Sequence, residues 1–450
     1  MRENMHKTVL ILMIVILLCI GVNCKKDPVT PPVNPLQLMV EDMSCTEVYL
    51  KLSLSSGEQN RTLVLKRDDS VVAAITMTNN DSLFVDDGLL PNKTYTYSLI
   101  SNNWKITEQA TTMDTTTQKF TWQIDTLGTS STPSSVLYDV AIISDTLIMA
   151  VGEIFQEDSS GQTDLKRYNF VVQENKKWAI KRLPYHYQGS QYVNPINSVF
   201  SFNHNNIWFG GNGLIYFDGQ NYIEDLKFNP LWGSYLINRM WSNSQNNIFV
   251  IGTDGQIAHN DGVSWSKEES NTSQHLYDIY GTDKTIVVSG SDINAGKGIV
   301  LRKNDAGWET IGEGEVISPN QLFKPKLYGS LASVWVDEKN TIYAAGNLLY
   351  KYQFNKWSYV TSLPENFING NPNVYYRGFI SKIRGNKSND MWIAGDRNTL
   401  RHFNGYSWVQ VGLPYDPQSD IIWRSLDVKG NLCVAVGEAG NRAIVIRIKK

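Results

Sequence analysis

A short hydrophobic segment that ends in glycine occurs seven times between Leu147 and Gly437. The seven glycines are 38 to 59 residues apart, and an aromatic residue usually follows each one after a turn. Repetition at this interval indicates copies of one supersecondary unit that stack or surround an axis. The copies are LIMAVG (Leu147–Gly152), IWFGG (Ile207–Gly211), IFVIG (Ile248–Gly252), TIVVSG (Thr285–Gly290), TIYAAG (Thr341–Gly346), MWIAG (Met391–Gly395) and LCVAVG (Leu432–Gly437).

One copy, from Leu236 to Glu269, shows the unit in full. It contains four strand-like segments, with Thr253-Asp254-Gly255 and Asn260-Asp261-Gly262 between them. Asp-Gly and Asn-Gly pairs favour tight hairpins because their backbones accept positive φ. Four strands per copy and seven copies predict a seven-bladed β-propeller over residues 117–450.

The two ends of this region are expected to share one blade. The last copy is one strand short, whereas the segment Phe120–Gly128 precedes the first copy and reads like the outer strand Tyr406–Pro414 of the sixth. Pairing the early segment with the last copy would remove two exposed sheet edges. The pattern of a hairpin turn followed by an aromatic residue resembles the propeller repeats of two-component-regulator sensors and, more loosely, sialidase-like Asp-box propellers. The Asp261–Trp265 segment is shorter than an Asp-box, so no sialidase active site is implied.

The sequence of residues 36–116 predicts a second, smaller folded unit. Six or seven short alternating strands in this length are typical of a β-sandwich, and no segment shows a sustained helical period, which makes the chain all-β. The sequence from Gly88 to Tyr97 resembles the corner of a fibronectin type III domain. That resemblance implies that Tyr95 is the corner tyrosine and that Tyr97 is a core residue.

The first 35 residues carry a targeting pattern. Residues 1–23 combine basic residues with an uncharged run from Thr8 to Val22, and Cys24 is followed by a Pro-rich stretch to residue 35. The order resembles a bacterial lipoprotein precursor, in which a signal peptide is removed, Cys24 is acylated and residues 24–35 act as a tether. An uncleaved anchor is the alternative. Either way we expect an outer-membrane lipoprotein in the cell envelope, facing the periplasm or the outside.

Composition limits the partners. The net charge is −3, and there are only 6 His and 4 Cys without a metal-ligand spacing. We therefore expect no metal, no cofactor and no nucleic-acid partner, and a monomer attached to the membrane through its lipid.

Aromatic residues fall into two groups. One group recurs at the outer strand of each copy and predicts packing between sheets: Trp122, Trp178, Trp265, Trp308, Trp357 and Trp408. The other lies in long loops that would open on one face of the propeller, where it either closes the loops or lines a ligand site. The ligand-site candidates are Tyr185, Tyr187, Trp232, Tyr235, Tyr375, Tyr376, Arg377 and Trp423.

Alignment of the copies also predicts a polar ring at the central channel, either a solvated plug or a site for an ion or substrate. Its members are Asp139, Ser198, Arg239, Asp278, Ser333, Lys382 and Ser425. Asp139 and Asp278 belong to the first and fourth copies, so we expect them to be too far apart for paired acid–base chemistry.

Together these features predict an envelope-anchored binding or adhesion protein whose propeller recognises a glycan or a protein. Catalysis is not expected, since no nucleophile motif or phosphate loop is present. Two alternatives stay open: a glycoside hydrolase or lyase that acts on polysaccharide, and an assembly factor for envelope proteins.

Overall fold

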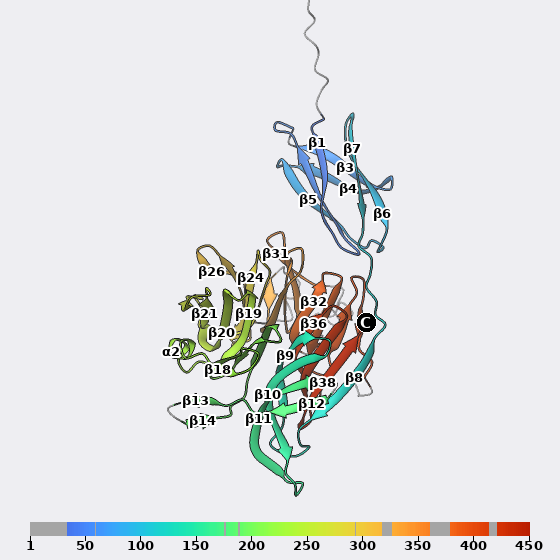
Figure 1. Ribbon diagram of the computed structural model, residues 1–450. Coiled ribbons are helices and arrows are strands. Elements are labelled where there is room, and N and C mark those ends of the chain that lie inside the picture. Colours follow the sequence, from blue (N-terminus) through green and yellow to red (C-terminus); the bar gives the residue numbers. More distant parts are fainter. Residues whose placement is uncertain are drawn as a thin grey trace, which may run out of the picture. The chain divides into compact units, whose positions relative to one another are not determined.

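The computed structural model describes residues 34–58, 60–174, 177–187, 190–292, 294–316, 326–360, 379–413 and 421–450 (Figure 1). Contacts between Cα atoms divide the chain into two compact units. The first holds the segments up to Asp42, Val48–Asp86 and Thr94–Ala110, and the second holds Met43–Glu47, Asp87–Lys93 and Thr111–Lys450. No helix in the described ranges is long and apolar enough to cross a membrane.

The first unit consists of two antiparallel sheets. The three-stranded sheet has the order β1 (Leu36–Met43), β2 (Val48–Leu54), β5 (Asp81–Asp86), and the four-stranded sheet has the order β4 (Ser70–Met77), β3 (Arg61–Arg67), β6 (Thr94–Ser101), β7 (Trp104–Thr111). Tyr95 and Tyr97 are both buried, and the Tyr97 hydroxyl donates a hydrogen bond of 2.7 Å to Asp86 Oδ2. Arg67 Nη1 binds both oxygens of Asp86 at 2.8 and 2.9 Å, so an ion pair completes this buried polar group.

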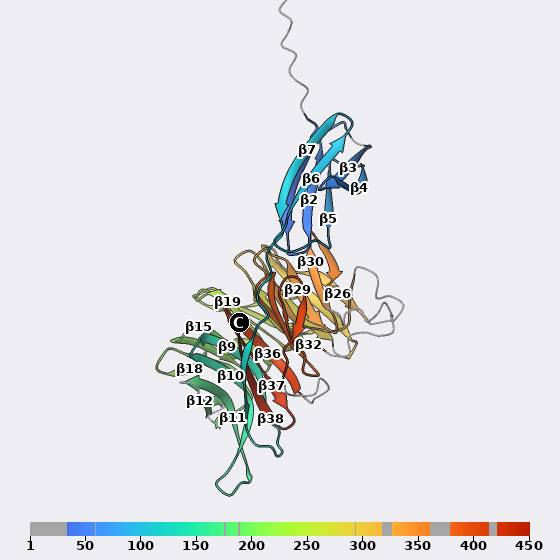
Figure 2. The ribbon, with the colours of Figure 1, turned by 90° about the vertical axis from the view of Figure 1, so that its right-hand side faces the viewer.

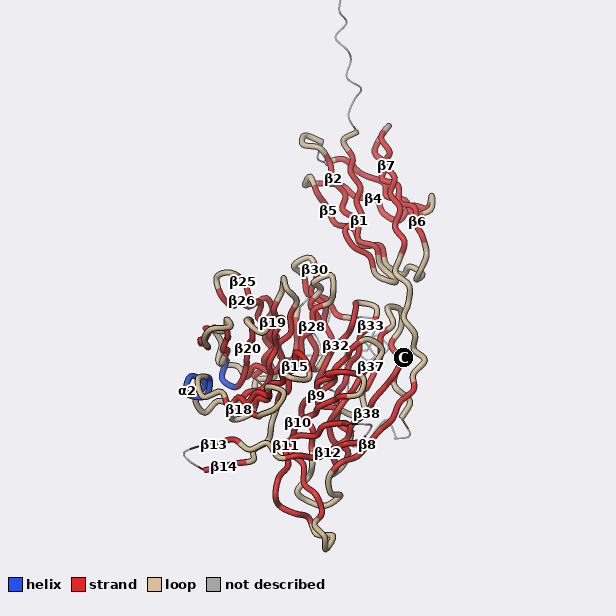
Figure 3. The backbone as a smooth tube through the Cα atoms, viewed as in Figure 1, coloured by secondary structure: helices blue, strands red, loops and turns tan. Residues whose placement is uncertain are grey.

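Antiparallel sheets of four strands make up the second unit, and strands dominate its trace (Figure 3). We number these sheets as blades in chain order. Blades one to three are β9 (Val136–Ser144), β10 (Leu147–Glu157), β11 (Thr163–Glu174) and β12 (Lys177–Lys181); β15 (Ser198–Asn203), β16 (Asn206–Gly210), β17 (Leu214–Phe217) and β18 (Tyr222–Glu224); and β19 (Ile237–Ser244), β20 (Asn247–Gly252), β21 (Ile257–Asn260) and β22 (Trp265–Glu268).

The later blades repeat this order from the inner strand outward. Blade four also takes up the short parallel strand β27 (Leu327–Tyr328). Blades four to seven are β23 (His275–Gly281), β24 (Ile286–Asp292), β25 (Lys297–Asn304) and β26 (Gly307–Glu315); β28 (Leu331–Val336), β29 (Ile342–Gly346), β30 (Leu349–Gln353) and β31 (Lys356–Tyr359); β32 (Ile380–Lys387), β33 (Asp390–Gly395), β34 (Leu400–Phe403) and β35 (Trp408–Gln410); and β36 (Ile421–Lys429), β37 (Leu432–Ala439), β38 (Arg442–Lys449) and β8 (Thr121–Leu127).

Blade seven is closed by strands from opposite ends of the propeller region. The last strand, β38, follows β36 and β37 (Figure 2) and pairs on its other side with β8, from Lys449 opposite Thr121 to Ala443 opposite Leu127. The predicted closure is confirmed, with the expected segment in the expected blade.

The repeated glycines mark a close approach between the first two strands of each blade. A Cβ atom built on Gly346 would lie 2.0 Å from the Ser330 carbonyl oxygen, and one on Gly152 would lie 2.1 Å from that of Val136. The other five repeated glycines likewise face a carbonyl oxygen at the start of their own inner strand. Only glycine fits there without displacing the backbone, which explains why the motif ends in this residue in every copy.

Two of the segments that were expected to be loops carrying ligand-site candidates contain regular structure. Tyr185–Pro195 includes the hairpin of β13 (Tyr185–Tyr187) and β14 (Ser190–Tyr192), and Phe228–Tyr235 begins with a short helix, α2 (Phe228–Trp232). The helix was not predicted, because its single turn is too short to show a period. Asp225 Oδ1 accepts the backbone N–H groups of Lys227, the N-cap residue, and Phe228, the first residue of the helix, and so satisfies donors at the start of the helix.

Candidate functional site

The polar ring predicted from the repeat lies on the inner strands of the propeller, one residue per blade. Each ring residue stands opposite the residue that directly precedes the repeated glycine of its blade; Asp139 faces Val151 and Asp278 faces Ser289. The same register holds for Ser198, Arg239, Ser333, Lys382 and Ser425.

Four ring residues cap the free edge of the following blade. Val199 N–H donates to Asp139 Oδ2 at 3.0 Å, and Val334 N–H donates to Asp278 Oδ2 at 3.1 Å. The serines act alike: Ser198 Oγ accepts from Met240 N–H at 3.2 Å and Ser333 Oγ from Ile383 N–H at 3.1 Å. An inner strand has no neighbour on its channel side, so its N–H groups need acceptors from elsewhere. The ring therefore joins adjacent blades.

Arg239 and Lys382 occupy the ring positions of blades three and six, where a cation replaces the acceptor. Lys382 Nζ donates to Asp278 Oδ1 at 2.6 Å, and Arg239 forms ion pairs with Asp139 and, at 3.7 Å, with Asp278. Asp139 and Asp278, which were expected to lie too far apart for paired acid–base chemistry, thus pair with the same guanidinium group, and that expectation stays a prediction.

A second ring, two residues further along each inner strand, was missed by the sequence reasoning. It includes Arg384, whose Nη1 and Nη2 bind the two oxygens of Asp278 at 2.9 and 2.8 Å, and Asp427, whose Oδ2 accepts Ile142 N–H at 2.8 Å. Alternation along a strand places residues i and i+2 on the same face, so the same alignment offset by two would have found both.

Burial and charge set the protonation of this cluster. Burial alone would raise the pKa of Asp278, but Arg384 and Lys382 outweigh it and hold that pKa well below its usual range. Burial, with Arg239 and Arg384 nearby, lowers the pKa of Lys382 to about 7. Burial raises the pKa of the Asp427 carboxyl. Asp278 is thus ionised at neutral pH, and its oxygens bind Lys382 and Arg384 as well as the Val334 N–H.

A cavity of about 200 Å³ opens onto this cluster. Its lining follows the inner strands from the first ring to the second and includes aromatic side chains as well as charges. The Arg384 guanidinium lies 4.8 Å from the centre of the Tyr280 ring, in cation–π contact. The lining includes Phe200, Arg239, Ile279, Tyr280, Lys382 and Leu426.

The loop aromatics give a different result. Trp232 and Trp423 are 1% and 0% exposed, and their indole N–H groups donate to Tyr235 O at 2.8 Å and Asn398 Oδ1 at 3.2 Å. Both indole side chains pack in the core. A ligand-binding role would require them to be exposed, and they are not. Tyr185 accepts a hydrogen bond of 2.8 Å from Asn194 Nδ2.

The remaining candidates give little evidence for or against a ligand site. The Tyr235 ring lies 5.3 Å from Lys267 Nζ, and Tyr187 lies in β13 with its side chain outside the described part. Cys24 and the Tyr375–Arg377 segment fall outside the described residues. A ligand role for this loop face stays a prediction.

The outer-strand tryptophans pack between blades as predicted. Trp178 Nε1 donates to Asp125 Oδ2 at 3.0 Å, Trp265 Nε1 to Asp225 Oδ2 at 2.8 Å, and Trp357 Nε1 to Ile311 O at 2.8 Å. Each acceptor lies in the preceding blade or in the loop that leaves that blade. Trp122 differs, since 37% of it is exposed.

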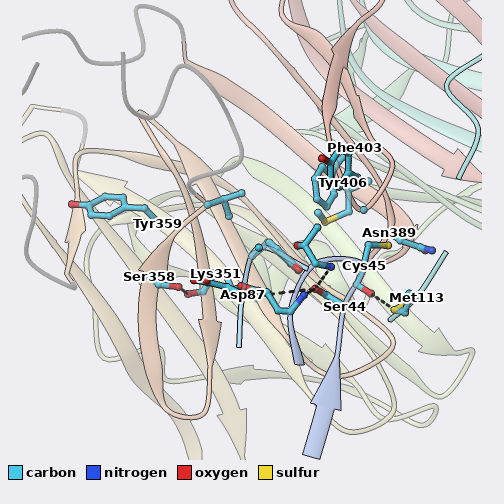
Figure 4. Close-up of a pocket in the computed structure, with 18 residues that line it drawn as sticks. Ser44, Cys45, Asp87, Met113, Lys351, Ser358, Tyr359, Asn389, Phe403 and Tyr406 are labelled. Atoms are coloured by element: carbon cyan, nitrogen blue, oxygen red, sulfur yellow. Dashed lines mark hydrogen bonds and ion pairs between the residues drawn. The ribbon is translucent and has the colours of Figure 1, made fainter. Parts of the chain in front are cut away.

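A larger cavity, of about 610 Å³, lies within the second unit and is lined partly by its segments 43–47 and 87–93 (Figure 4). Cys45 lines it, and its thiol donates to Asp114 O at 3.2 Å. Burial, followed by the nearby Asp114, raises the thiol pKa to about 11. The thiol is therefore a structural hydrogen-bond donor rather than a nucleophile.

Comparison with known proteins supports the fold. A structure described as YCF48 bound to D1 peptide has 14% sequence identity, covers 73% of this chain and 95% of its own, and superposes with a TM-score of 0.50. YCF48 from Cyanidioschyzon merolae (11% identity, 73% and 98% coverage, TM-score 0.45) and the WD40 propeller domain of Doa1 (12%, 74% and 98%, 0.47) are also similar. No protein-family model and no curated protein matches the sequence. The chain thus contains a β-propeller.

Proposed function

We propose that this chain is an envelope-anchored assembly factor whose propeller holds a segment of a protein partner. The observation that carries the proposal is the propeller's similarity to the structure described as YCF48 bound to D1 peptide. Propellers present a rigid surface built from many loops, which suits recognition of an extended segment.

The central cluster supports binding over catalysis. Glycosidases need one carboxyl that can donate a proton and a second carboxylate as base or nucleophile. Asp139 and Asp278 instead cap backbone N–H groups and pair with cations. Recognition of a glycan through the loop aromatics is also less favoured, because Trp232 and Trp423 are buried.

The anchor and the first unit complete the proposal. Cys24 would carry the lipid at the outer membrane, and residues 24–35 would act as a stiff tether. The first unit would serve as a fibronectin type III-like spacer. Its two sheets, of three and four strands, and its buried Tyr95 and Tyr97 support this reading.

The test is purification of the full lipidated chain from cross-linked native membranes, with a glycan array probed by the same preparation. One membrane protein recovered in constant stoichiometry, absent from a Cys24→Ser control that is not anchored, is the expected result. Saturable glycan binding with no protein partner, or release of reducing ends from a polysaccharide, would overturn the proposal.

A further inference from the structure

The acceptors of the central cluster are already in use. Asp139 accepts from Val199 N–H and from Ser425 Oγ at 2.8 Å, and the two oxygens of Asp278 accept from Lys382, Arg384, Ser333 and Val334. Asp427 Oδ1 and Oδ2 accept the backbone N–H groups of Val428 and Ile142. The three carboxylates thus have their main donors within the protein.

The donors of the cluster are in surplus. Nη1 of Arg239 pairs with Asp139, but its Nε, which is buried and 3.7 Å from Asp278 Oδ1, has no hydrogen-bond acceptor among the described residues. Lys382 carries three N–H donors, and the described side chains accept one of them, through Asp278. Buried donors without acceptors are costly, so such a site favours a guest that supplies acceptors.

Two backbone donors add to this surplus. Ile279 and Leu426 follow the ring positions Asp278 and Ser425 and are thus equivalent to Val199, Met240, Val334 and Ile383, whose N–H groups point to the preceding ring residue. For Ile279 and Leu426 the preceding ring residue is Arg239 or Lys382, neither of which has an acceptor. Both residues line the cavity.

The cavity has room for a guest beside these donors. Its volume of about 200 Å³ exceeds that of several waters, each of which takes about 30 Å³. Phe200 and Tyr280 form apolar parts of its wall, and both are partly exposed. Asp139 and Asp427 also line the cavity, but their oxygens already accept donors within the protein. The cationic side chains and backbone N–H groups around this small, partly apolar space are the recognition chemistry of an oxyanion.

We propose that the propeller's central cavity binds one oxyanion group, a carboxylate or a phosphate, through Arg239, Lys382 and the N–H groups of Ile279 and Leu426. The site is independent of the proposed protein partner, since a free small anion is enough to fill it.

The test is calorimetric titration of the purified chain with sodium acetate and, separately, with inorganic phosphate, at constant ionic strength set with chloride. We expect saturable one-to-one binding of at least one probe, with a Kd on the order of 1 mM or tighter. Acetate alone would identify a carboxylate site, and phosphate alone a phosphate site.

Variants locate the binding. Arg239→Met should weaken it about tenfold or more, and Arg239→Lys should weaken it less. Arg302→Met, which removes a partly exposed cation paired with Glu309 outside the cavity, should leave the binding unchanged. No saturable binding of either probe to the unaltered chain would overturn the proposal even if Arg239→Met failed to fold. Equal loss in Arg302→Met would overturn it as well, since the effect would then come from general surface charge.

Discussion

Trp308 of blade four donates a hydrogen bond of 2.6 Å from its indole Nε1 to Glu268 Oε2 of blade three. Lys303 Nζ lies 3.1 Å from the same oxygen, and His259 Nδ1 lies 3.4 Å from Glu268 Oε1. One carboxylate thus joins two neighbouring blades at their outer strands. Burial would raise the pKa of Glu268, but the hydrogen bonds from His259, Lys303 and Trp308 outweigh burial and lower it to about 2.

This pKa predicts an acid-sensitive contribution to stability. The folded pKa of Glu268 is below its ordinary value of 4.5, so the stabilisation is complete above pH 4.5 and is lost as the pH falls towards 2. We expect Glu268→Gln, which keeps an acceptor for Trp308, to lower the unfolding free energy at pH 7 by about 2–3 kcal/mol at most. Urea unfolding at pH 7 and pH 3 measures this, and the loss should shrink at pH 3. An equal loss at both pH values would contradict the assignment.

Gly346→Ala should destabilise the propeller strongly. The added Cβ would meet the Ser330 carbonyl oxygen at 2.0 Å, and backbone must move to relieve the clash. We expect a loss of about 3 kcal/mol or more, measured by urea unfolding. Gly412→Ala is the matched control, since its Cβ would have no atom within 4 Å. Similar midpoints for the two variants would show that the repeated glycine is not required for close approach.

Ser333→Ala tests the capping role of the ring. The hydroxyl accepts the Ile383 N–H and donates to Asp278, and both partners are buried. Removing it leaves a buried donor unsatisfied, which costs about 1–3 kcal/mol. Ser358→Ala removes an exposed hydroxyl whose bond to Lys351 O is 3.4 Å long, and should cost little. Thermal unfolding of both variants measures this difference. Equal melting temperatures for the two variants would contradict the capping role.

A disulfide across the closing strands should stabilise the propeller. Thr121 and Lys449 are cross-strand partners, and a bond between cysteines at these positions would close a loop of more than 300 residues. The chain-entropy account gives up to about 5 kcal/mol for such a loop. The oxidised Thr121→Cys, Lys449→Cys variant should melt higher than its reduced form. A pair placed out of register, at Thr121 and Arg442, should fail to form the bond.

Cys24→Ser tests the proposed anchor. If Cys24 is acylated, metabolic labelling with palmitate should mark the natural chain and not the variant, and the variant should leave the membrane fraction. Continued membrane association without label would favour the uncleaved-anchor alternative.

The repeat made most of the architecture predictable. Each copy carries its own turn signals and glycine, so blade number, strand order and the Phe120–Gly128 closure could all be read from local pattern. The helix at Phe228–Trp232 could not be predicted, because five residues are too few to show a helical period. In the sequence, Trp232 looks like an exposed aromatic residue of a loop. Its burial depends on packing against Phe228, with ring centroids 5.2 Å apart, a contact that no pattern in the sequence shows.

The central cluster was half predictable. Alignment placed Asp139, Arg239, Asp278 and Lys382 in one ring, but the aligned letters do not show which carboxylate meets which cation. That pairing depends on side-chain reach across the channel: Arg384 comes from blade six and binds Asp278 of blade four. Loop aromatics were the least predictable, since residues in long loops serve local cores as readily as ligands.

The union of β8 with β38 has a consequence for biosynthesis. Six blades can form in order as the chain emerges, but the seventh needs a strand near residue 121 and another after residue 441. Strand β8 therefore has no β38 to pair with until nearly the whole polypeptide has been translated. Any product of premature termination would carry two open edges, which are ready templates for aggregation and for proteases. The propeller can therefore close only in a chain that has been translated as far as its last strand.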